Sequence, residues 1–318
     1  MNKRICVIGG GRWGQNHIKT LYNMGNLAGI VENDPDRLKE LLKFYPVNGF
    51  NSVSNANKEK FDGYIVATPA ETHYTIGKQL LELGLNVLIE KPMALKSEHS
   101  EELINIAIKT GSHLMVGHVL LFHPAIRKIK ELIDEGRIGQ MYYVYSTRLN
   151  TGTVRTTENV FWSFAPHDIS VLDFLIGKSA IKIEAKASTF LQPGIADFTM
   201  AQLSYPDNIQ GHIFTSWLHP IKEQRLIVVG SKAMISFNDS SKEKEVILHH
   251  KHFYFEKGIP VKMEKDDEII PYESKMPLNE ELNYFITHID SKIEIADGKS
   301  GHEVVKILES VQNIIGNN

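Results

Sequence analysis

The stretch Gly9-Gly10-Gly11-Arg12-Trp13-Gly14 decides the fold of the first part of this chain, because of the segments on either side of it. The apolar run 4–8 is typical of a buried parallel strand, and residues 15–23 have a helix-compatible composition without proline. A strand, a G-x-G-x-x-G motif at Gly9, Gly11 and Gly14, and a helix begin a dinucleotide-binding βαβ unit. We expect the pyrophosphate at the helix N-terminus, where unpaired N–H groups favour negative charge, with Arg12 and Trp13 also contacting the cofactor.

An acidic residue follows the second predicted strand at the distance that this unit requires. Residues 27–31 form that strand, and Glu32 comes directly after it. An acid about 20 residues beyond the first glycines accepts hydrogen bonds from ribose hydroxyls and repels a 2′-phosphate. Glu32 therefore favours NAD over NADP, and Arg37 lies near enough to weaken that preference. In the alternative, Glu32 and Asp34 only begin the helix predicted over 35–44.

The composition is that of an ordinary globular protein. A chain of 318 residues, 42% hydrophobic and 23% charged, is long enough for two domains. A net charge of −3 gives no reason to expect a nucleic acid or an acidic membrane as a partner. The single cysteine, Cys6, is predicted to be a small core residue, which suits a reducing compartment. No stretch has the length of a membrane span, so we expect a cytoplasmic protein.

The pattern of elements changes along the chain. Up to about residue 116, further strands at 63–67, 85–89 and 112–116 alternate with helices at 71–83 and 97–109. This alternation predicts a doubly wound parallel sheet in an α/β fold. Later runs with period-two alternation predict a mostly antiparallel sheet with one covered face. These runs are 141–149, 181–190, 198–205, 209–218, 225–229 and 233–237, and further helices are predicted at 126–135, 167–175, 279–289 and 301–315.

Two short segments at predicted strand ends carry chemistry. Thr68-Pro69, with His73 shortly after it, lies at the carboxyl edge of the sheet, where open α/β sheets bind ligands. Glu90-Lys91-Pro92 follows the next strand, and Pro92 restricts the backbone there. A lysine at that edge is suited to exchange a proton with a substrate oxygen. On spacing alone, a solvated surface lysine is the favoured alternative.

A third segment, 162–168, begins an amphipathic helix and contains His167. A histidine there is suited to general acid–base chemistry near neutral pH. The alternative is a histidine at a helix end whose ring is satisfied by backbone groups.

Taken together, these motifs resemble the Gfo/Idh/MocA oxidoreductase family in order and spacing over essentially the whole chain. The resemblance implies a Rossmann domain over 1–120 and an α/β domain over 121–318, whose large open sheet binds substrate and usually mediates dimers or tetramers. The last helix is a candidate to pack back on the first domain. It implies hydride transfer between NAD and a hydroxyl or keto carbon, typically of a sugar or cyclitol. Lys91 matches the catalytic lysine, with Glu90 beside it, and His167 matches the histidine of the substrate domain.

Two positions depart from the family pattern. Ser163 stands where many members carry an aspartate, four residues before the histidine, and His118-Val119 stands where many have Phe-Asn. An aspartate would hold the imidazole and raise its pKa. We therefore assign proton transfer mainly to Lys91, with an assisting or orienting role for His167. His118 and His123 are further candidates for contacts near the nicotinamide, or else packing residues.

The segment 148–162 is expected to border the substrate pocket. Arg148, Arg155 and Asn150, followed by an aromatic cluster that includes Trp162, suit a polyanionic substrate with a ring to stack. Asp168 is a further substrate-binding candidate. This segment resembles UDP-N-acetylglucosaminuronate 3-dehydrogenases of bacterial surface-polysaccharide pathways, which implies oxidation of the sugar 3-hydroxyl by NAD. Alternatively, the arginines lie in a solvated loop.

Other readings of the chain stay open. The resemblance also admits a 3-ketosugar reductase, an inositol or free-sugar dehydrogenase, sugar hydrolysis through transient redox, and a non-catalytic NAD-binding regulator. No metal is expected, because His249, His250 and His252 lie in a predicted exposed hairpin and His302-Glu303 lacks the second ligand of H-E-x-x-H. Trp217 is expected to pack in a sheet. The expected partners are a nucleotide sugar and further copies of the chain, as a homodimer or homotetramer.

Overall fold

The computed structural model of the protein describes residues 2–316, which form two compact units. The first unit combines the chain up to Phe122 with Lys275–Lys306, and the second combines His123–Ser274 with the residues from Ile307 onward. The predicted division at residue 120 differs from this arrangement in one segment, because residues 275–306 return to the first unit.

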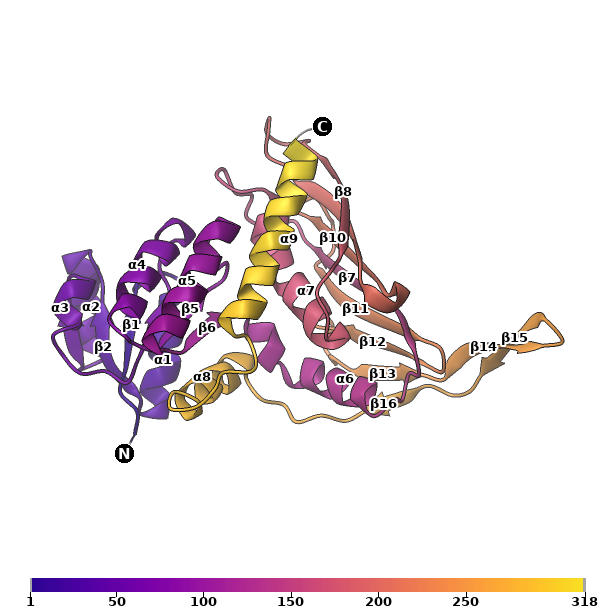
Figure 1. The fold of residues 1–318 in the computed structure, drawn as a ribbon, viewed down its shortest axis with the longest axis horizontal. Helices are drawn as coiled ribbons and strands as arrows, with labels where there is room; N and C mark the ends of the chain where they lie inside the picture. The colour runs from indigo at the N-terminus through magenta and orange to yellow at the C-terminus, as the bar shows by residue number, and fades with distance from the viewer. Residues whose placement is uncertain (1, 317–318) are drawn as a thin grey trace. The chain divides into compact units, whose positions relative to one another are not determined.

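The first unit contains a six-stranded parallel sheet in the order β3-β2-β1-β4-β5-β6 (Figure 1). Its strands are β1 (Ile5–Ile8), β2 (Leu27–Val31), β3 (Asn48–Phe50), β4 (Gly63–Val66), β5 (Val87–Glu90) and β6 (Leu114–Gly117). Strands β1, β4, β5 and β6 are buried along their whole length, as parallel strands with both faces covered require. The order reverses between β1 and β4, and ligands bind at the carboxyl ends of strands at such a switch point. The predicted doubly wound sheet is confirmed, and Cys6 is buried in β1 as expected.

Local sequence signals explain the helices of the first unit. They are α1 (Gly14–Met24), α2 (Pro35–Phe44), α3 (Val53–Ala56), α4 (Ala70–Glu82), α5 (Ser97–Thr110), the 3₁₀ turn η1 (Val119–Phe122), α8 (Pro277–Thr287) and the first part of α9 (Gly298–Gly316). Asp34 caps α2, since its carboxylate accepts from the N–H groups of Asp36 and Arg37. Gly25 ends α1 in the left-handed conformation, with φ of 74°.

Helix α8 belongs to the first unit because its apolar face packs on β4. A Cβ atom on Gly63 would lie 2.6 Å from the side chain of Ile289 and 3.0 Å from that of Phe285. Only glycine at residue 63 allows this approach. The predicted helix over 279–289 is therefore confirmed as an element, but it completes the core of the dinucleotide-binding unit.

The second unit contains an eight-stranded sheet in the order β16-β13-β12-β11-β7-β10-β9-β8. Its strands are β7 (Met141–Leu149), β8 (Lys182–Ser188), β9 (Phe198–Ser204), β10 (Gln210–Ser216), β11 (Glu223–Gly230), β12 (Met234–Asn238), β13 (Val246–His249) and β16 (Glu268–Ile270). All neighbours are antiparallel except β7 and β10, so the predicted mostly antiparallel sheet is confirmed. Strands β14 (Lys251–Glu256) and β15 (Ile259–Glu264) form a separate hairpin that projects from this sheet (Figure 1).

Helix α7 (Val160–Ile176) packs against β7, β9 and β10, and α6 (Pro124–Asp134) packs against α7. The short 3₁₀ turn η2 (Pro206–Asn208) joins β9 to β10. The sequence predicted a helix from His167, and that start is wrong, because α7 begins at Val160 and carries Pro166 in its interior. Asn159 caps it by accepting from the N–H of Trp162, and its amide donates to Gln312 of α9. His167 therefore lies inside the helix and not at its end.

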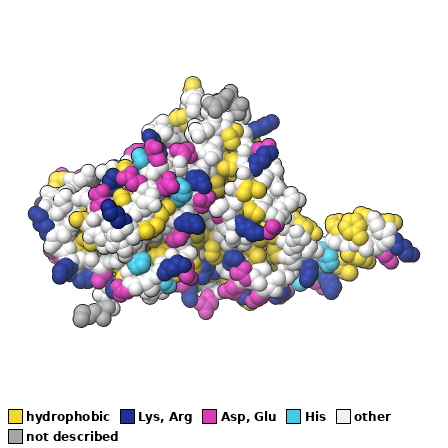
Figure 2. Space-filling view, viewed as in Figure 1, with side chains coloured by type: hydrophobic (Ala, Val, Ile, Leu, Met, Phe, Trp, Pro, Cys, Tyr) yellow, Lys and Arg dark blue, Asp and Glu magenta, His cyan; other side chains and the backbone are white. Residues whose placement is uncertain are grey.

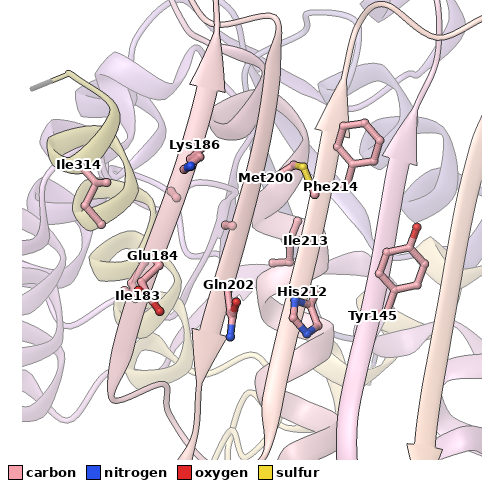
Figure 3. A pocket seen from close by; sticks show the side chains of 12 residues that line it. Tyr145, Ile183, Glu184, Lys186, Met200, Gln202, His212, Ile213, Phe214 and Ile314 are labelled. Carbon is pink, nitrogen blue, oxygen red and sulfur yellow. The ribbon is translucent and has the colours of Figure 1, made fainter. Parts of the chain in front are cut away.

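The sheet of the second unit has one covered and one uncovered face. Helices lie behind the strands in Figure 3, and outward-facing side chains of β7 to β10 lie on the other side. Trp217 is buried next to the end of β10, which confirms that it packs in the fold. Among residues 2–316, the structure contains no helix with the length and apolar character of a membrane span.

Candidate active site

The glycine turn of the first unit has the geometry of a pyrophosphate-binding loop. Gly9 adopts a φ of 102°, and a Cβ on Gly14 would lie only 1.9 Å from the Gly9 carbonyl oxygen. In contrast, a Cβ on Gly11 would meet no atom within 4 Å. Gly9 and Gly14 thus shape the turn itself, and Gly11 keeps one side of it open for a ligand. Arg12 and Trp13 lie in the same turn, with the indole of Trp13 partly exposed.

Glu32 is fixed at the carboxyl end of β2. Its buried carboxylate accepts from the N–H of Gly10 at 2.8 Å and from the N–H of Asp34 at 3.0 Å. The guanidinium of Arg37 lies 3.5 Å from the same carboxylate. Backbone donors hold Glu32 in place beside the glycine turn, as an acceptor for ribose hydroxyls requires. Together with the open side of the turn, this arrangement fits a dinucleotide cofactor.

His73 ties two loops of the first unit together. Its Nδ1 lies 2.8 Å from the carbonyl oxygen of Pro92, and its Nε2 lies 2.8 Å from that of Thr68. Pro69 precedes α4, and the hydroxyl of Thr68 pairs with that of Thr72. The loop after β4 is thereby attached to the loop after β5, where the Lys91–Pro92 peptide bond is cis. Thr68, Pro69 and His73 lie together at the sheet edge, with His73 buried under the loops.

Glu90 is the most constrained charged group in the first unit. Its Oε1 accepts from the indole N–H of Trp13 at 2.6 Å and lies 2.7 Å from Nε2 of His17, while its Oε2 accepts from the N–H of Lys91 at 3.1 Å. Burial alone would raise the pKa of Glu90, but the hydrogen bonds and charges of His17, Trp13 and Lys91 outweigh it and lower that pKa. Glu90 is therefore a buried carboxylate anion next to Lys91.

Gly117 and His118 enclose this carboxylate from β6. A Cβ on Gly117 would lie 2.7 Å from Oε1 of Glu90, so only glycine leaves room for the charged group. His118 is buried, and neither ring nitrogen has a hydrogen-bond partner among the described residues. Burial lowers the pKa of His118 to about 4, partly offset by Glu90. His118 is thus a neutral ring near neutral pH, held close to Glu90 and Lys91.

A second buried acid lies in the electrostatic field of Glu90. Glu281 on α8 is fully buried, and neither of its oxygens has a hydrogen-bond partner among residues 2–316. Burial raises the pKa of Glu281 well above its usual range, and the negative charge of Glu90 adds to the shift. Glu281 is thus held as a neutral carboxylic acid.

In the second unit, Asp168 and Arg148 form a buried pair. The carboxylate of Asp168 accepts from Nε of Arg148 at 2.9 Å, from its Nη2 at 3.2 Å and from the hydroxyl of Ser146 at 2.6 Å. Both charged side chains are largely shielded from solvent. Asp168 therefore orients Arg148, and a bidentate pair of this kind fixes the direction of the guanidinium.

The other predicted substrate residues lie around the beginning of α7. Asn150 follows β7, and a Cβ on Gly152 would lie 2.5 Å from its side-chain oxygen. Arg155 lies in the exposed segment before α7, where its guanidinium is 3.7 Å from Glu158. Trp162, Ser163 and His167 lie on α7, partly buried.

Some functional features were missed from the sequence. His17, Gly117 and Glu281 were not predicted, although Trp13 at the N-cap of α1 and His17 in its first turn are four residues apart and therefore lie on the same side. His123, predicted either to contact the region near the nicotinamide or to pack, lies in the second unit, where its Nδ1 caps α6 by accepting from the N–H of Ala125 and its Nε2 lies 3.6 Å from Asp239. In the described part of the chain, no group of three histidine, cysteine or acidic side chains is placed to hold a metal ion.

Comparison with known proteins agrees with this geometry. A model of the Gfo/Idh/MocA oxidoreductase family with an NAD-binding Rossmann fold matches residues 3–118, and the C-terminal domain model of the same family matches residues 126–236. The chain belongs to the Gfo/Idh/MocA oxidoreductase family. This membership confirms the resemblance drawn from the motifs, the cofactor NAD and the class of enzyme, an oxidoreductase.

Two of the similar proteins cover nearly the whole chain, and a third covers part of it. The UDP-N-acetylglucosamine 3-dehydrogenase of Acidithiobacillus ferrooxidans is 23% identical to this chain, over 96% of this chain and 95% of the relative. The solved structure of that enzyme aligns with a TM-score of 0.88 at 22% identity, and the alignment covers 100% of this chain and 98% of the other. The WlbA dehydrogenase from Bordetella pertussis, crystallised with NADH and UDP-GlcNAcA, aligns with a TM-score of 0.79 at 19% identity over 99% and 96%. An inositol 2-dehydrogenase of Rhizobium meliloti is 24% identical over 62% of each chain.

Substitution of Gly11 and of Gly14 should separate cofactor binding from folding. We expect Gly11→Ala to leave the thermal midpoint unchanged and to weaken NAD binding about tenfold or more, because its Cβ occupies the space kept open for the pyrophosphate. Gly14→Ala should instead destabilise the protein by about 3 kcal/mol, since its Cβ meets the Gly9 carbonyl. Calorimetric NAD titration and urea unfolding of both variants measure the two effects. Equal loss of stability in both would contradict the prediction.

Replacing Glu32 should change the choice between the two nicotinamide cofactors. In Glu32→Ser the negative charge is lost and Arg37 is released toward the ribose, so the ratio of kcat/KM for NADP over NAD should rise about tenfold or more. Asp36→Ser, which changes an exposed acid two residues into α2, should leave the ratio unchanged. An unaltered ratio in Glu32→Ser would mean that Glu32 only caps the turn.

The raised pKa of Glu281 should appear in the pH dependence of stability. The folded protein keeps this proton at pH values where the unfolded chain releases it, so stability should fall as the pH rises above about 4.3. We expect Glu281→Gln to remove that slope and to be more stable than wild type at pH 7. Urea unfolding between pH 5 and pH 8, with Glu280→Gln as the matched control on the same helix, measures the difference. Parallel profiles for wild type and Glu281→Gln would refute it.

Proposed function

We propose that the protein oxidises a hydroxyl group of a nucleotide-linked sugar, most specifically the 3-hydroxyl of UDP-N-acetylglucosaminuronate, with NAD as hydride acceptor. The observation that carries the proposal is the fixed Glu90-Lys91 corner at the carboxyl end of β5. It belongs to the same unit as the glycine turn and Glu32, and its carboxylate is held from three directions. The relative from A. ferrooxidans, by its name, acts at the same carbon of a UDP-sugar.

Each residue has a defined role in this reaction. When bound, NAD takes the hydride from the carbon that bears the hydroxyl group. Lys91, in its unprotonated form, takes the hydroxyl proton directly or through one water, so that the carbon–oxygen bond becomes a carbonyl. Glu90 holds the backbone of Lys91, and the negative charge of Glu90 next to it stabilises the ammonium that forms. His167 assists or orients the substrate.

The residues of the second unit suit a polar, anionic substrate. Arg148 is oriented by Asp168, and Arg155 lies in an exposed segment close to Asn150 and Trp162 in the sequence. A guanidinium binds carboxylate or phosphate groups through two parallel hydrogen bonds. We assign Arg155 to the carboxylate or phosphate groups of the sugar nucleotide and Trp162 to stacking. We further propose that residues 121–318 form the subunit interface of a homodimer or homotetramer. We also propose that the enzyme works in the cytoplasm.

A second candidate substrate is UDP-N-acetylglucosamine, which lacks the uronate carboxylate. It is favoured by the name of the relative that covers 95% of its own length. Comparing the two sugars separates the candidates, because only the uronate offers a sugar carboxylate to Arg155. If the uronate is the substrate and its carboxylate meets Arg155, Arg155→Ala should lower kcat/KM for it about tenfold or more. The same substitution should then have little effect on any turnover of UDP-N-acetylglucosamine.

The decisive experiment follows NADH absorbance after NAD and UDP-N-acetylglucosaminuronate are mixed with wild-type protein, Lys91→Ala or Lys91→Arg. We expect turnover by wild type and a loss of about 10²–10⁴-fold in kcat for Lys91→Ala, the usual contribution of a general base. A 2-oxoacid in a parallel sample recycles any tightly held cofactor. NAD binding by calorimetry shows that the variants are folded.

The other outcomes distinguish the alternatives. Turnover of myo-inositol instead of the UDP-sugars would make the protein an inositol dehydrogenase, as the R. meliloti relative is named. NADH consumption with 3-keto sugars and none with the alcohols would make it a reductase. Sugar hydrolysis without net NADH would indicate transient redox. NAD binding without any turnover, together with full biological activity of Lys91→Ala, would indicate a regulator.

A further inference from the structure

Three loops of the second unit lie at one edge of its sheet and expose apolar side chains. Strands β7, β8 and β10 all end at this edge (Figure 3), and the loops that follow them are 150–159, 189–197 and 217–222. The exposed apolar side chains on these loops are Val154, Phe190, Leu191, Leu218 and Ile221. Figure 2 shows hydrophobic side chains at the top of the view, where the loop after β8 lies in Figure 1. A group of exposed apolar side chains of this kind marks an interaction site.

Hydrogen bonds join the three loops to one another. The side-chain amide of Gln192, in the loop after β8, donates to the backbone carbonyl of Arg155, in the loop after β7. The hydroxyl of Thr151 in that same loop donates to the backbone carbonyl of His219, in the loop after β10, at 2.7 Å. The loops therefore form one connected wall, which carries the exposed guanidinium of Arg155 and leads directly into α7.

The loop after β8 holds Phe190 on a rigid base. The carboxylate of Asp197, which is fully buried, accepts from the N–H groups of Phe190 and Leu191 at 2.7 Å and 2.8 Å. Pro193 and Gly194, the latter with a φ of 76°, form the tight turn that follows. Phe190 is nevertheless 69% exposed. A buried acid that fixes the backbone of an exposed aromatic residue indicates a ring that is pre-organised for a ligand.

We propose that the ring of Phe190 is the surface on which the uracil base of the nucleotide sugar stacks. This inference rests on the proposed function, because it says where the nucleotide part of that substrate binds. Every nucleobase offers a flat π-face to an aromatic ring. Arg155, on the loop that is bonded to the loop of Phe190, supplies a guanidinium for an anionic group of the same molecule. The wall therefore offers an aromatic ring and a cation for a ligand that has a base and phosphates.

The base suits Phe190 better than the other ring systems of the two substrates. The adenosine end of NAD is assigned to the glycine turn and Glu32, which lie in the first unit. The hydroxyl groups of the sugar need hydrogen-bonding side chains, and Phe190 and its neighbour Leu191 have none. Trp162 lies on the same helix as His167, so Trp162 remains the aromatic residue assigned to the sugar ring.

Binding of UDP to the NAD-saturated protein tests this role of Phe190 without any turnover. We expect Phe190→Ala to raise the dissociation constant of UDP about tenfold or more, measured by calorimetry, because the stacking contact is lost. Phe190→Tyr keeps a flat ring and should keep the wild-type constant. Phe253→Ala, at a similarly exposed phenylalanine (63%) of the β14–β15 hairpin, is the matched control and should leave the constant unchanged. Both phenylalanines are exposed, so the variants keep the fold of the chain.

Two further readouts separate stacking on the base from a structural role of Phe190. In saturation-transfer NMR with UDP, the uracil protons should receive stronger saturation than the ribose protons in wild type, and Phe190→Ala should lose this difference. In kinetics, Phe190→Ala should lower kcat/KM for UDP-N-acetylglucosaminuronate about tenfold or more. The same variant should leave kcat/KM unchanged for the 1-phosphate of that sugar, which has no base.

The outcomes separate this inference from the proposed function. Turnover of the UDP-sugar, with unchanged UDP affinity and kcat/KM in Phe190→Ala, overturns the stacking role and leaves the proposed function intact. UDP binding that depends on Phe190, without turnover of any UDP-sugar, supports the stacking role and overturns the proposed function. Wild-type protein that does not bind UDP overturns the stacking role. A changed sedimentation mass of Phe190→Ala, with unchanged UDP affinity, overturns it in favour of a contact between subunits.

Discussion

The first unit depends on one buried charge, the carboxylate of Glu90. An ionised group in the interior is costly unless it is paired and hydrogen-bonded. Trp13 and His17 approach Glu90 from the beginning of α1, the Lys91 N–H comes from its own strand, and Gly117 leaves the space that it fills. These contacts fix the glycine turn, the end of β5 and the end of β6 relative to one another. The same carboxylate thereby positions both the cofactor turn and the residue proposed as the base.

The second buried acid shows how this charge is kept in one place. Two carboxylates in one apolar region cannot both ionise at neutral pH without a large electrostatic penalty. Glu90 has donors and Glu281 has none among the described residues, so the negative charge lies on Glu90 and the proton on Glu281. His118, which is neutral for the same reason of burial, adds no opposing positive charge. Of the two buried acids, Glu90 therefore carries the negative charge next to Lys91.

Sequence reasoning succeeded where the signals were local and failed where distant segments meet. Residues 27–31 and 35–44 match β2 and α2 because a strand end, a cap and a proline mark them directly. The predicted start of helix α7 was too late for two reasons. Proline is typical of a first helical turn, so Pro166 suggested a start there, and the helix is apolar on most sides, so its sequence shows little 3.6-residue periodicity. The hydrogen bond from Trp13 to Glu90 could not be predicted from the sequence, because the two residues are 77 positions apart in the chain. The burial of Glu281 on α8 could not be predicted either, because a charged residue on an amphipathic helix is usually solvated.

In the second unit, the buried pair of Asp168 and Arg148 fits the proposed division of roles, in which Lys91 moves the proton and the second unit binds the substrate. The acid next to His167 in the sequence, Asp168, already binds Arg148 through two hydrogen bonds and Ser146 through a third. Its charge is balanced there, and breaking such a buried pair is costly. An Arg148–Asp168 pair that holds its guanidinium in one direction is better suited to orient an anionic substrate than to move a proton.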